Sequence, residues 1–495
     1  MRQAIHILRK DVRYLWIETT VALIAAGLLA FTGVRQAYAL TRPEITHGIA
    51  TAAMLLPFLL PIAWWTLIVR AVYAETLTGD RQFWPTRPYA WRSLLAAKWL
   101  LILLFVNMPL FLAQTAIVLS AGFPLSPQLA GLLWTQVLLT VAFDLPVAAV
   151  AALTTGVVQF LLCVLIVFAS SMALSMGSMR ITMAFAGGGW RGMEWIETYY
   201  SLLLIAIVGA AILIWQYRTR RTVPARVLAG LALLILALGA PFSWSTAFAI
   251  QSHFSRLHVD EASLHAGLFT NFQWATRAIV NRDGSVSLHI PLELSGVPGD
   301  LEPRTEGLTV RIEGAGGAIW DKNEAPWAEV STNGRLIALQ TTVDGAFYQK
   351  VKDQPVSLRG YLYLTLYGNQ RVTRVPFDDH TQPVPGLGLC SASGGGNAPY
   401  FLSCNSTFRP PSELVSVAFG EGPNEGTPYS RPQVHSYSPL PAELSLNPVN
   451  PFVQWSTSKK VLDAATVVSV EPLAHVRAAI AIDGLRLGEH EVRIK

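Results

Sequence analysis

The first half of the chain is a succession of long apolar runs, whereas the second half alternates apolar and polar residues. Before residue 250, apolar stretches of about 20 residues, the length that crosses the hydrocarbon core of a bilayer, recur between short polar segments. They predict seven spanning helices, at 15–33, 49–69, 99–121, 129–148, 152–174, 198–215 and 227–248. The charge-free run 99–143 holds two of them, because its centre, AGFPLSPQLAG, has the proline and glycine of a turn.

From about residue 251 the period changes to two, which is typical of half-buried strands. The run 286–294 alternates strictly, and so does 361–367, after which Gly368 and Asn369 predict a turn into 372–375. Because two such faces can bury each other, residues 251–495 are expected to form an antiparallel β-sandwich. The Pro/Gly/Ser-rich stretch 381–450 leaves open whether this is one large sandwich or two small ones.

Charge separates the same two halves and predicts their orientation. Residues 1–250 carry 17 Lys/Arg and 8 Asp/Glu, whereas 251–495 carry 20 and 24. With a cytoplasmic N-terminus, the cytoplasmic segments hold thirteen Lys/Arg and the outer loops four, as the positive-inside rule favours. Seven spans then predict a multi-pass protein of the cytoplasmic (inner) membrane, in which residues 251–495 form an extracytoplasmic domain. Ala37-Tyr38-Ala39 resembles a signal-peptidase site, but the apolar run before it is longer than a signal peptide needs.

Composition argues against an ordinary soluble enzyme, since 14% of the residues are charged against about 25% in a typical soluble domain. The sequence has no GxxxxGK[ST], HExxH or GxSxG motif and no zinc-type cysteine spacing, so we expect no catalytic residue, metal or cofactor. Outside the cytoplasm, Cys390 and Cys404 would form a disulfide that closes a loop of about 15 residues. Two buried free thiols are an equally good interpretation.

Six polar residues interrupt the apolar runs, where each is costly in lipid and therefore faces protein or water. The six are Glu18, Asn107, Gln114, Gln136, Asp144 and Gln159. Hydrogen bonds between helices are the first interpretation, and a polar pathway through the membrane is the second. Asp144 is expected near the end of the fourth span, close to the lipid headgroups.

The loop after the second span, RAVYAETLTGDRQFWPTRPYAWRSLLAAKWL (70–100), mixes acidic, basic and exposed aromatic residues with two prolines. Aromatic residues and arginine are enriched at binding interfaces. Anchoring to headgroups through Trp and Arg is the alternative.

This loop, together with the basic amphipathic N-terminus ILRKDVRYLW, resembles the permease subunits of ATP-binding-cassette (ABC) transporters of the type-2 exporter class. The resemblance covers roughly residues 1–220. It implies that the N-terminal segment lies along the inner membrane face and that a coupling helix in the loop docks into a separate ATPase subunit. The implied contact residues are Glu75, Asp80, Arg81, Phe83, Trp84, Arg87 and Pro88. Such permeases commonly have six spans, whereas this chain adds a seventh and a large outer domain.

The resulting hypothesis is a permease subunit of an ABC exporter, in which ATP hydrolysis takes place on the partner. Its expected partners are the ATPase, a second identical or related permease and the lipid bilayer, with no nucleic acid. The alternative is a membrane-anchored sensing or binding protein whose outer β-domain recognises a ligand or partner.

Overall fold

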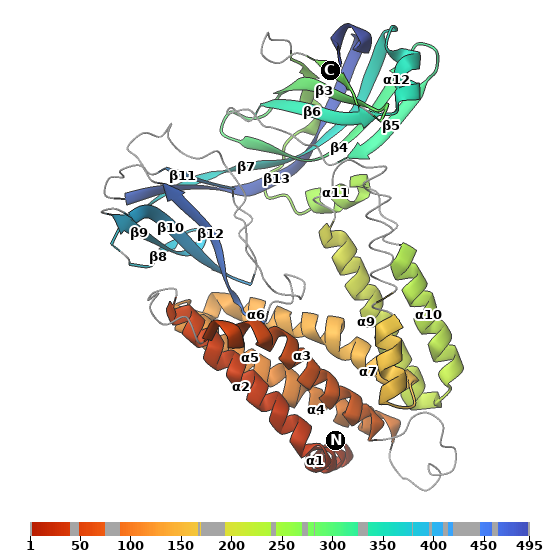
Figure 1. Cartoon of the computed structure of the whole chain (residues 1–495), viewed down its shortest axis with the longest axis vertical. Coiled ribbons are helices and arrows are strands. Elements are labelled where there is room, and N and C mark those ends of the chain that lie inside the picture. The colour runs from red at the N-terminus through yellow and green to blue at the C-terminus, as the bar shows by residue number, and fades with distance from the viewer. Residues whose placement is uncertain are drawn as a thin grey trace.

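The computed structural model places a helical bundle at one end of the molecule and β-sheets at the other (Figure 1). It describes residues 2–39, 49–74, 90–166, 169, 194–238, 244–269, 276–281, 283–324, 335–378, 380–395, 398–408, 414–418, 446–457 and 464–493. We call the end of the bundle near the sheets the sheet end, and the opposite end the α1 end.

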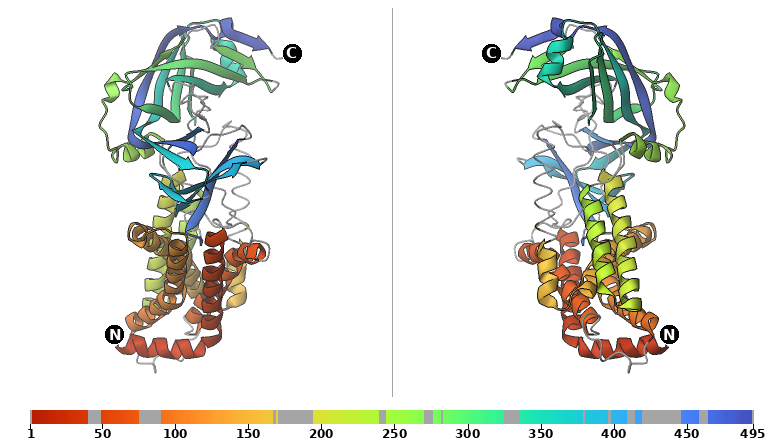
Figure 2. Two further views of the ribbon diagram at one scale, coloured as in Figure 1. Left: turned by 90° about the vertical axis from the view of Figure 1, so that its left-hand side faces the viewer. Right: turned by 90° about the vertical axis from the view of Figure 1, so that its right-hand side faces the viewer.

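Helix α1 (Arg2–Tyr14) lies across the α1 end of the bundle (Figure 2). Its buried residues, Ala4, Ile7 and Asp11, are three and four positions apart, so they form one stripe along the helix. The other faces are mostly basic or exposed, and α1 is thus the amphipathic helix that the sequence indicates.

Among the residues that the structure describes, five helices are long and apolar enough to cross a membrane: Trp16–Arg35, Leu55–Tyr73, Trp91–Ser120, Leu125–Leu153 and Thr198–Thr219. They belong to α2 (Trp16–Ala39), α3 (Ile49–Tyr73), α4–η2–α5 (Trp91–Ile102, Leu103–Asn107, Met108–Ser120), α6–η3–α7 (Leu125–Leu139, Thr140–Asp144, Leu145–Leu153) and α9 (Glu194–Thr219).

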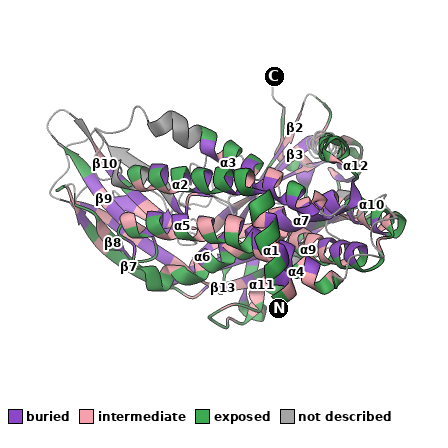
Figure 3. Ribbon diagram, turned by 90° about the horizontal axis from the view of Figure 1, so that it is seen from below, coloured by how far each residue is buried: buried purple, intermediate pink, exposed green. Residues whose placement is uncertain are grey.

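Exposed residues line the outward faces of these helices (Figure 3), and many of them are large and apolar. Ile24, Phe58 and Leu203 are 58%, 54% and 61% exposed, one on each of three helices. Such a continuous apolar exterior is unfavourable in water and matches lipid tails. The helices therefore indicate a membrane protein.

Two further apolar helices, Val157–Ile166 and α10 (Thr222–Leu238), overlap the fifth and seventh expected spans. Within the described residues both are shorter than a bilayer span, so the structure supports five spans where the sequence predicts seven. The turn before Val157 lies at 154–156, later than expected, because α7 continues to Leu153. The expectation that Asp144 lies near the end of its span is therefore wrong, because its helix continues for nine more residues.

Two of the long helices each contain one turn of π-helix, η2 and η3. Each π-turn ends two residues before a proline, Pro109 or Pro146. Proline has no N–H for the carbonyl four residues earlier, and its ring crowds that carbonyl. A wider π-turn gives the ring room without ending the helix. This explains why the apolar run continues as one helix through each proline.

The larger sheet has ten strands in the order β14-β2-β3-β1-β13-β7-β4-β5, with β6 paired to β3 and β11 paired to β13. The strands are β1 (His265–Leu268), β2 (Arg277–Val280), β3 (Val286–Ser295), β4 (Glu302–Gly314), β5 (Ile319–Glu324), β6 (Leu336–Val343), β7 (Val356–Pro376), β11 (Leu414–Ala418), β13 (Ala464–Leu485) and β14 (Glu491–Arg493). The pairs β1–β13 and β14–β2 are parallel, so this sheet is mixed rather than antiparallel throughout.

This sheet curls around its own core, and the short helix α12 (Gly345–Val351) contributes the buried Tyr348 to it (Figure 1). Strand β3 alternates as its sequence predicts, with Leu288 and Ile290 fully buried. The turn expected at Gly368 and Asn369 is not formed, because β7 runs through both residues alongside the equally long β13. Asn369 has a φ of 51°, opposite a register shift in β13, so the pair bends there instead of reversing.

The smaller sheet is antiparallel, in the order β12-β10-β9-β8. Its strands are β8 (Gln382–Val384), β9 (Gly388–Gly395), β10 (Ala398–Thr407) and β12 (Val449–Thr457). Leu402 of this sheet shares a core with Val375, Val417 and Val467 of the larger one. Two layers thus meet only at this end, and the described strands do not form a sandwich over the whole of 251–495.

Cys390 and Cys404 face each other on β9 and β10, are joined by a disulfide and lie in the shared core.

We expect alkylation of the unfolded, unreduced chain to modify only Cys163, which is free, and all three cysteines to react after reduction. Cys404→Ser should lower the free energy of unfolding by about 3 kcal/mol, the value for a loop of this size. Mass spectrometry and denaturant titration measure these effects. Three modified cysteines without reductant would contradict the disulfide.

Candidate functional site

The seven residues implied to contact an ATPase, Glu75, Asp80, Arg81, Phe83, Trp84, Arg87 and Pro88, lie outside the described residues. The structure does describe both flanks of their segment. Helix α3 ends at Tyr73 and α4 begins at Trp91, both at the α1 end of the bundle (Figure 1). The candidate site is therefore built from what holds these two helix ends.

The end of α3 is tied to two neighbours. The Arg70 guanidinium forms a salt bridge with the Glu18 carboxylate at the start of α2. The Tyr73 hydroxyl donates to the Gly156 carbonyl at 3.0 Å and lies 2.6 Å from the Thr154 hydroxyl. The last turn of α3 is thus fixed to α2 and to the turn that follows α7.

The first turns of α4 are tied to α1 by a buried ion pair. Lys98 Nζ donates to Asp11 Oδ2 at 2.7 Å, and the two side chains are 3% and 0% exposed. Both belong to apolar stripes, Asp11 with Ile7 on α1 and Lys98 with Leu101 on α4. Burying either charge alone costs several kcal/mol, so each position requires the other.

Basic side chains gather at this end of the bundle. Arg92 stacks over the Trp91 ring at 5.4 Å, a cation–π contact at the start of α4. Arg226, at the start of α10, donates to the Leu153 carbonyl at 2.9 and 3.3 Å. The α1 end therefore carries the positive charge that marks the cytoplasmic side in the sequence argument.

Neither ion pair is predicted from the sequence. Their signal is a single charged residue within an apolar stripe, which demands an opposite charge nearby. Asp11 and Lys98 have this signal, but they are 87 residues apart, and the less buried Glu18 and Arg70 are 52 residues apart. Because the partners lie so far apart in the sequence, the sequence pattern does not show which charges pair.

The six polar residues within the apolar runs fall into separate contacts rather than one continuous line. Glu18 pairs with Arg70 at the α1 end. Gln159 Oε1 accepts from the Thr155 backbone N–H at 3.1 Å and hydroxyl at 2.7 Å, at the start of its helix. These two residues hold helix ends in place.

Gln114 and Gln136 link α5 and α6 to the sheet region. Gln136 Nε2 donates to Gln114 Oε1 at 3.2 Å, and Gln114 Nε2 donates to the Leu446 carbonyl at 3.3 Å. The chain of two hydrogen bonds runs from α6 through α5 to the segment just before β12.

Asn107 and Asp144 lie where the two π-turns meet. Asn107 Nδ2, at the end of η2, donates to the Thr140 hydroxyl at the start of η3 at 3.1 Å. The Asp144 carboxyl, which has Asn107 and Thr140 as polar neighbours, is fully buried. Within the described part of the chain, neither of its oxygens has a hydrogen-bond partner by geometry.

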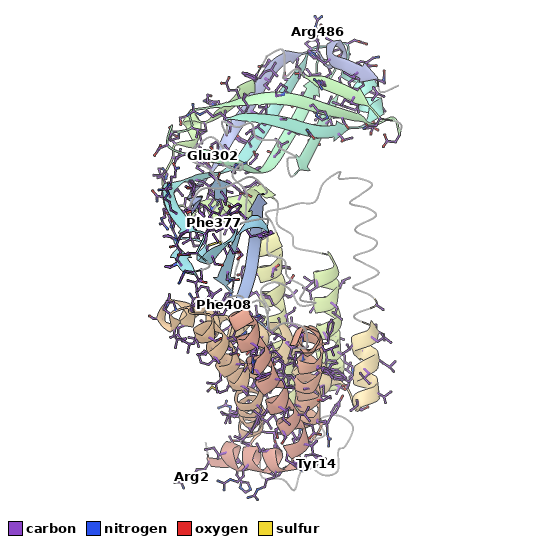
Figure 4. All side chains as sticks on the ribbon, turned by 60° about the vertical axis from the view of Figure 1, so that its left-hand side comes forward. Arg2, Tyr14, Glu302, Phe377, Phe408 and Arg486 are labelled. Carbon is purple, nitrogen blue, oxygen red and sulfur yellow. A yellow bond between two sulfur atoms is a disulfide. The ribbon has the colours of Figure 1, made fainter. Side chains whose placement is uncertain are left out.

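At the sheet end, the smaller sheet rests on the turn between α5 and α6 (Figure 4). The Thr407 hydroxyl donates to Gln128 Oε1 at 2.6 Å, and the Phe408 ring packs against Gly131 of α6. Phe408 has a φ of 61°, a strained conformation for this residue. A cleft of about 460 Å³ lies beside this contact, between the turn at 123–128 and the loop 383–389.

Among the described residues, no group of three or more His, Cys, Asp or Glu side chains could hold a metal ion. No protein-family model matches the chain, and no curated protein matches its sequence significantly. The function is therefore inferred from the sequence pattern and from the contacts at the two ends of the bundle.

We expect Lys98→Met to lower the free energy of unfolding by about 3–5 kcal/mol, because Asp11 would remain buried and unpaired. The double variant Asp11→Leu/Lys98→Met should recover most of this loss. Thermal unfolding of the four proteins gives the coupling energy. As a control, Arg311→Ala breaks an exposed pair with Glu313 and should change the stability by less than about 1 kcal/mol. Equal effects of Lys98→Met and Arg311→Ala would contradict the buried ion pair.

Two glycines in helices provide a matched test of the sheet contact. A Cβ at Gly131 would meet the Phe408 ring at 2.6 Å, whereas one at Gly230 of α10 meets nothing within 4 Å. Gly230→Ala should therefore stabilise the chain by roughly 0.5–1 kcal/mol through helix propensity. Gly131→Ala should destabilise it and speed proteolysis between bundle and sheets. The same gain at both positions would show that Phe408 does not pack on α6.

Proposed function

We propose that the chain is the membrane-spanning permease subunit of an ABC transporter of the exporter class, powered by a separate ATPase subunit that docks on loop 70–98. The observation that carries the proposal is that both flanks of the loop are fixed into the bundle. Arg70 and Tyr73 fix the end of α3, and Lys98 fixes the start of α4. A docking force on the loop would thus reach three neighbouring elements directly.

In this proposal the α1 end faces the cytoplasm and residues 251–495 lie outside. The gathering of Arg70, Arg92, Lys98 and Arg226 with the basic α1 supports this orientation through the positive-inside rule. The helices Val157–Ile166 and α10 are the described parts of a fifth and a seventh span. Seven crossings would put the N-terminus and the sheets on opposite sides of the membrane, which agrees with their positions at opposite ends of the bundle (Figure 1).

The chain itself would catalyse no covalent step. ATP binding to the partner would favour one packing of the helices over another, since a ligand shifts a conformational equilibrium only by its different affinity for the two states. The long helix α4–η2–α5 begins at the loop and ends beside the smaller sheet. It offers a direct path from an ATPase to the outer domain.

Trp84→Ala and Arg87→Ala should each weaken association with the ATPase by about 2 kcal/mol, because Trp and Arg dominate interface energies. The measurement is co-purification from detergent of the tagged chain, with the captured ATPase identified and quantified. Arg486→Ala, on an exposed side chain at the far end of the sheets, is the control and should change nothing. Unchanged capture with both loop variants would contradict the assigned contact.

Co-purification, together with labelling of the loop in intact cells, addresses the alternative. A chain that captures no ATPase, and whose loop is labelled from outside intact cells, would instead be a membrane-anchored sensing or binding protein. The cleft beside Phe123 and Leu389, at the surface of the bundle, is where a ligand of such a protein would be sought.

A further inference from the structure

Asp144 lies deep within the helical bundle. It is 19 residues from the start of α6 and nine from the end of α7, about 29 Å and 14 Å along a helix at 1.5 Å per residue. Its side chain is completely buried. Burying a carboxyl this deep in the bundle costs free energy, so a carboxyl at such a position is a candidate binding site.

No described counter-charge faces this carboxyl. The elements around η3 are α6 and α7 on its own helix, α9, η2 through the bond from Asn107, and α3 through the contact of Trp64 with Phe143. Segments 55–69, 99–120, 125–143, 145–153 and 201–216 contain no Lys, Arg, His, Asp, Glu, Tyr or Cys. The ionisable residues of these helices lie at their ends: Arg70 and Tyr73 on α3, Arg92 and Lys98 on α4, and Glu194, Glu197, Tyr199, Tyr200, Tyr217 and Arg218 on α9.

Asp11 and Glu18, the other two acids of the bundle whose side chains the structure describes, contrast with it. Asp11 and Glu18 each have a basic partner at hydrogen-bond distance. Asp144 has only the neutral Asn107 and Thr140, and Asn107 Oδ1 is itself buried without a described partner. A protonated carboxyl supplies one O–H donor, which an amide oxygen can accept. An ionised one would leave an uncompensated charge.

The site is also placed where the helices can adjust. Asn107 ends one π-turn, and Thr140 and Asp144 begin and end the other. π-turns inside α-helices occur frequently at functional sites. Separation of η2 from η3 would break the bond between Asn107 and Thr140 and admit water to the carboxyl.

We propose that Asp144, with Asn107 and Thr140, is a proton-binding site in the middle of the bundle, and that its proton exchanges with solvent when η2 and η3 separate. The closed packing holds the neutral acid, and the separated packing allows the carboxylate to be hydrated. Low pH therefore stabilises the closed packing, and high pH favours separation. The proposal does not depend on the presence of an ATPase partner.

Infrared difference spectroscopy of the full-length chain in lipid nanodiscs tests the bound proton. At neutral pH the wild type should show the C=O stretch of a protonated carboxylic acid, shifted by deuterium exchange and missing in Asp144→Asn. Glu18→Gln is the matched control and should keep the band, because Glu18 is ion-paired. Asn107→Leu removes a polar neighbour of the carboxyl and should keep the band at a shifted frequency. Absence of the band from the wild type would overturn the proposal.

The dependence of stability on pH provides a second readout. The apparent melting temperature of the wild type should fall as pH rises through the titration of Asp144. The Asp144→Asn side chain stays neutral at every pH, so the melting temperature of that variant should not show this fall. Parallel curves for the two proteins would overturn the proposal. So would stabilisation of the wild type alone by Na⁺ at constant ionic strength, since the site would then hold a metal cation in place of the proton.

Discussion

The buried ion pair between Asp11 and Lys98 is the constraint on which the arrangement of the α1 end depends. An amphipathic helix with one apolar stripe can lie on any apolar surface, and nothing in that stripe alone fixes where. A buried carboxylate is different, because it is tolerated only opposite a cation at hydrogen-bond distance. Lys98 supplies that cation at one position on α4. The pair thus sets the register of α1 against α4, and with it the geometry at the start of the helix that follows the loop.

The two prolines in the long helices lead to a second constraint. Pro109 and Pro146 would each kink or end a regular helix, yet both helices continue because a π-turn precedes each proline. A π-turn rotates the side chains at its end relative to the preceding helix. Asn107 and Asp144 are those end residues, and both point into the contact between the helices. The π-turns that accommodate the prolines therefore also bring the Asn107 amide and the Asp144 carboxyl together at the centre of the bundle.

The features that the sequence predicts correctly are local. Apolar runs mark the helices, and strict alternation marks β3, because burial acts on each residue through its immediate periodicity. The errors are non-local. Gly368 and Asn369 have the composition of a turn but lie in a long strand, since β13 offers a partner of matching length more than 90 residues later. The contacts of the candidate site are also non-local. A charged residue in an apolar segment indicates that it has a partner, but only the fold shows that Asp11 pairs with Lys98 and that Glu18 pairs with Arg70.

The helix α4–η2–α5 connects these features. It begins next to the loop, where Lys98 holds α1, passes through the π-turn that carries Asn107, and reaches Gln114, which donates to Leu446 beside the smaller sheet. A rigid helix moved at one end must move at the other, whereas a π-turn can absorb part of that movement in its wider, weaker hydrogen-bond pattern. If the two proposals hold, the contact between η2 and η3 sets how much displacement at the loop reaches the sheets. Because that contact includes a carboxyl for which no counter-charge is described, the protonation of Asp144 would then change the mechanical link between the two ends of the bundle.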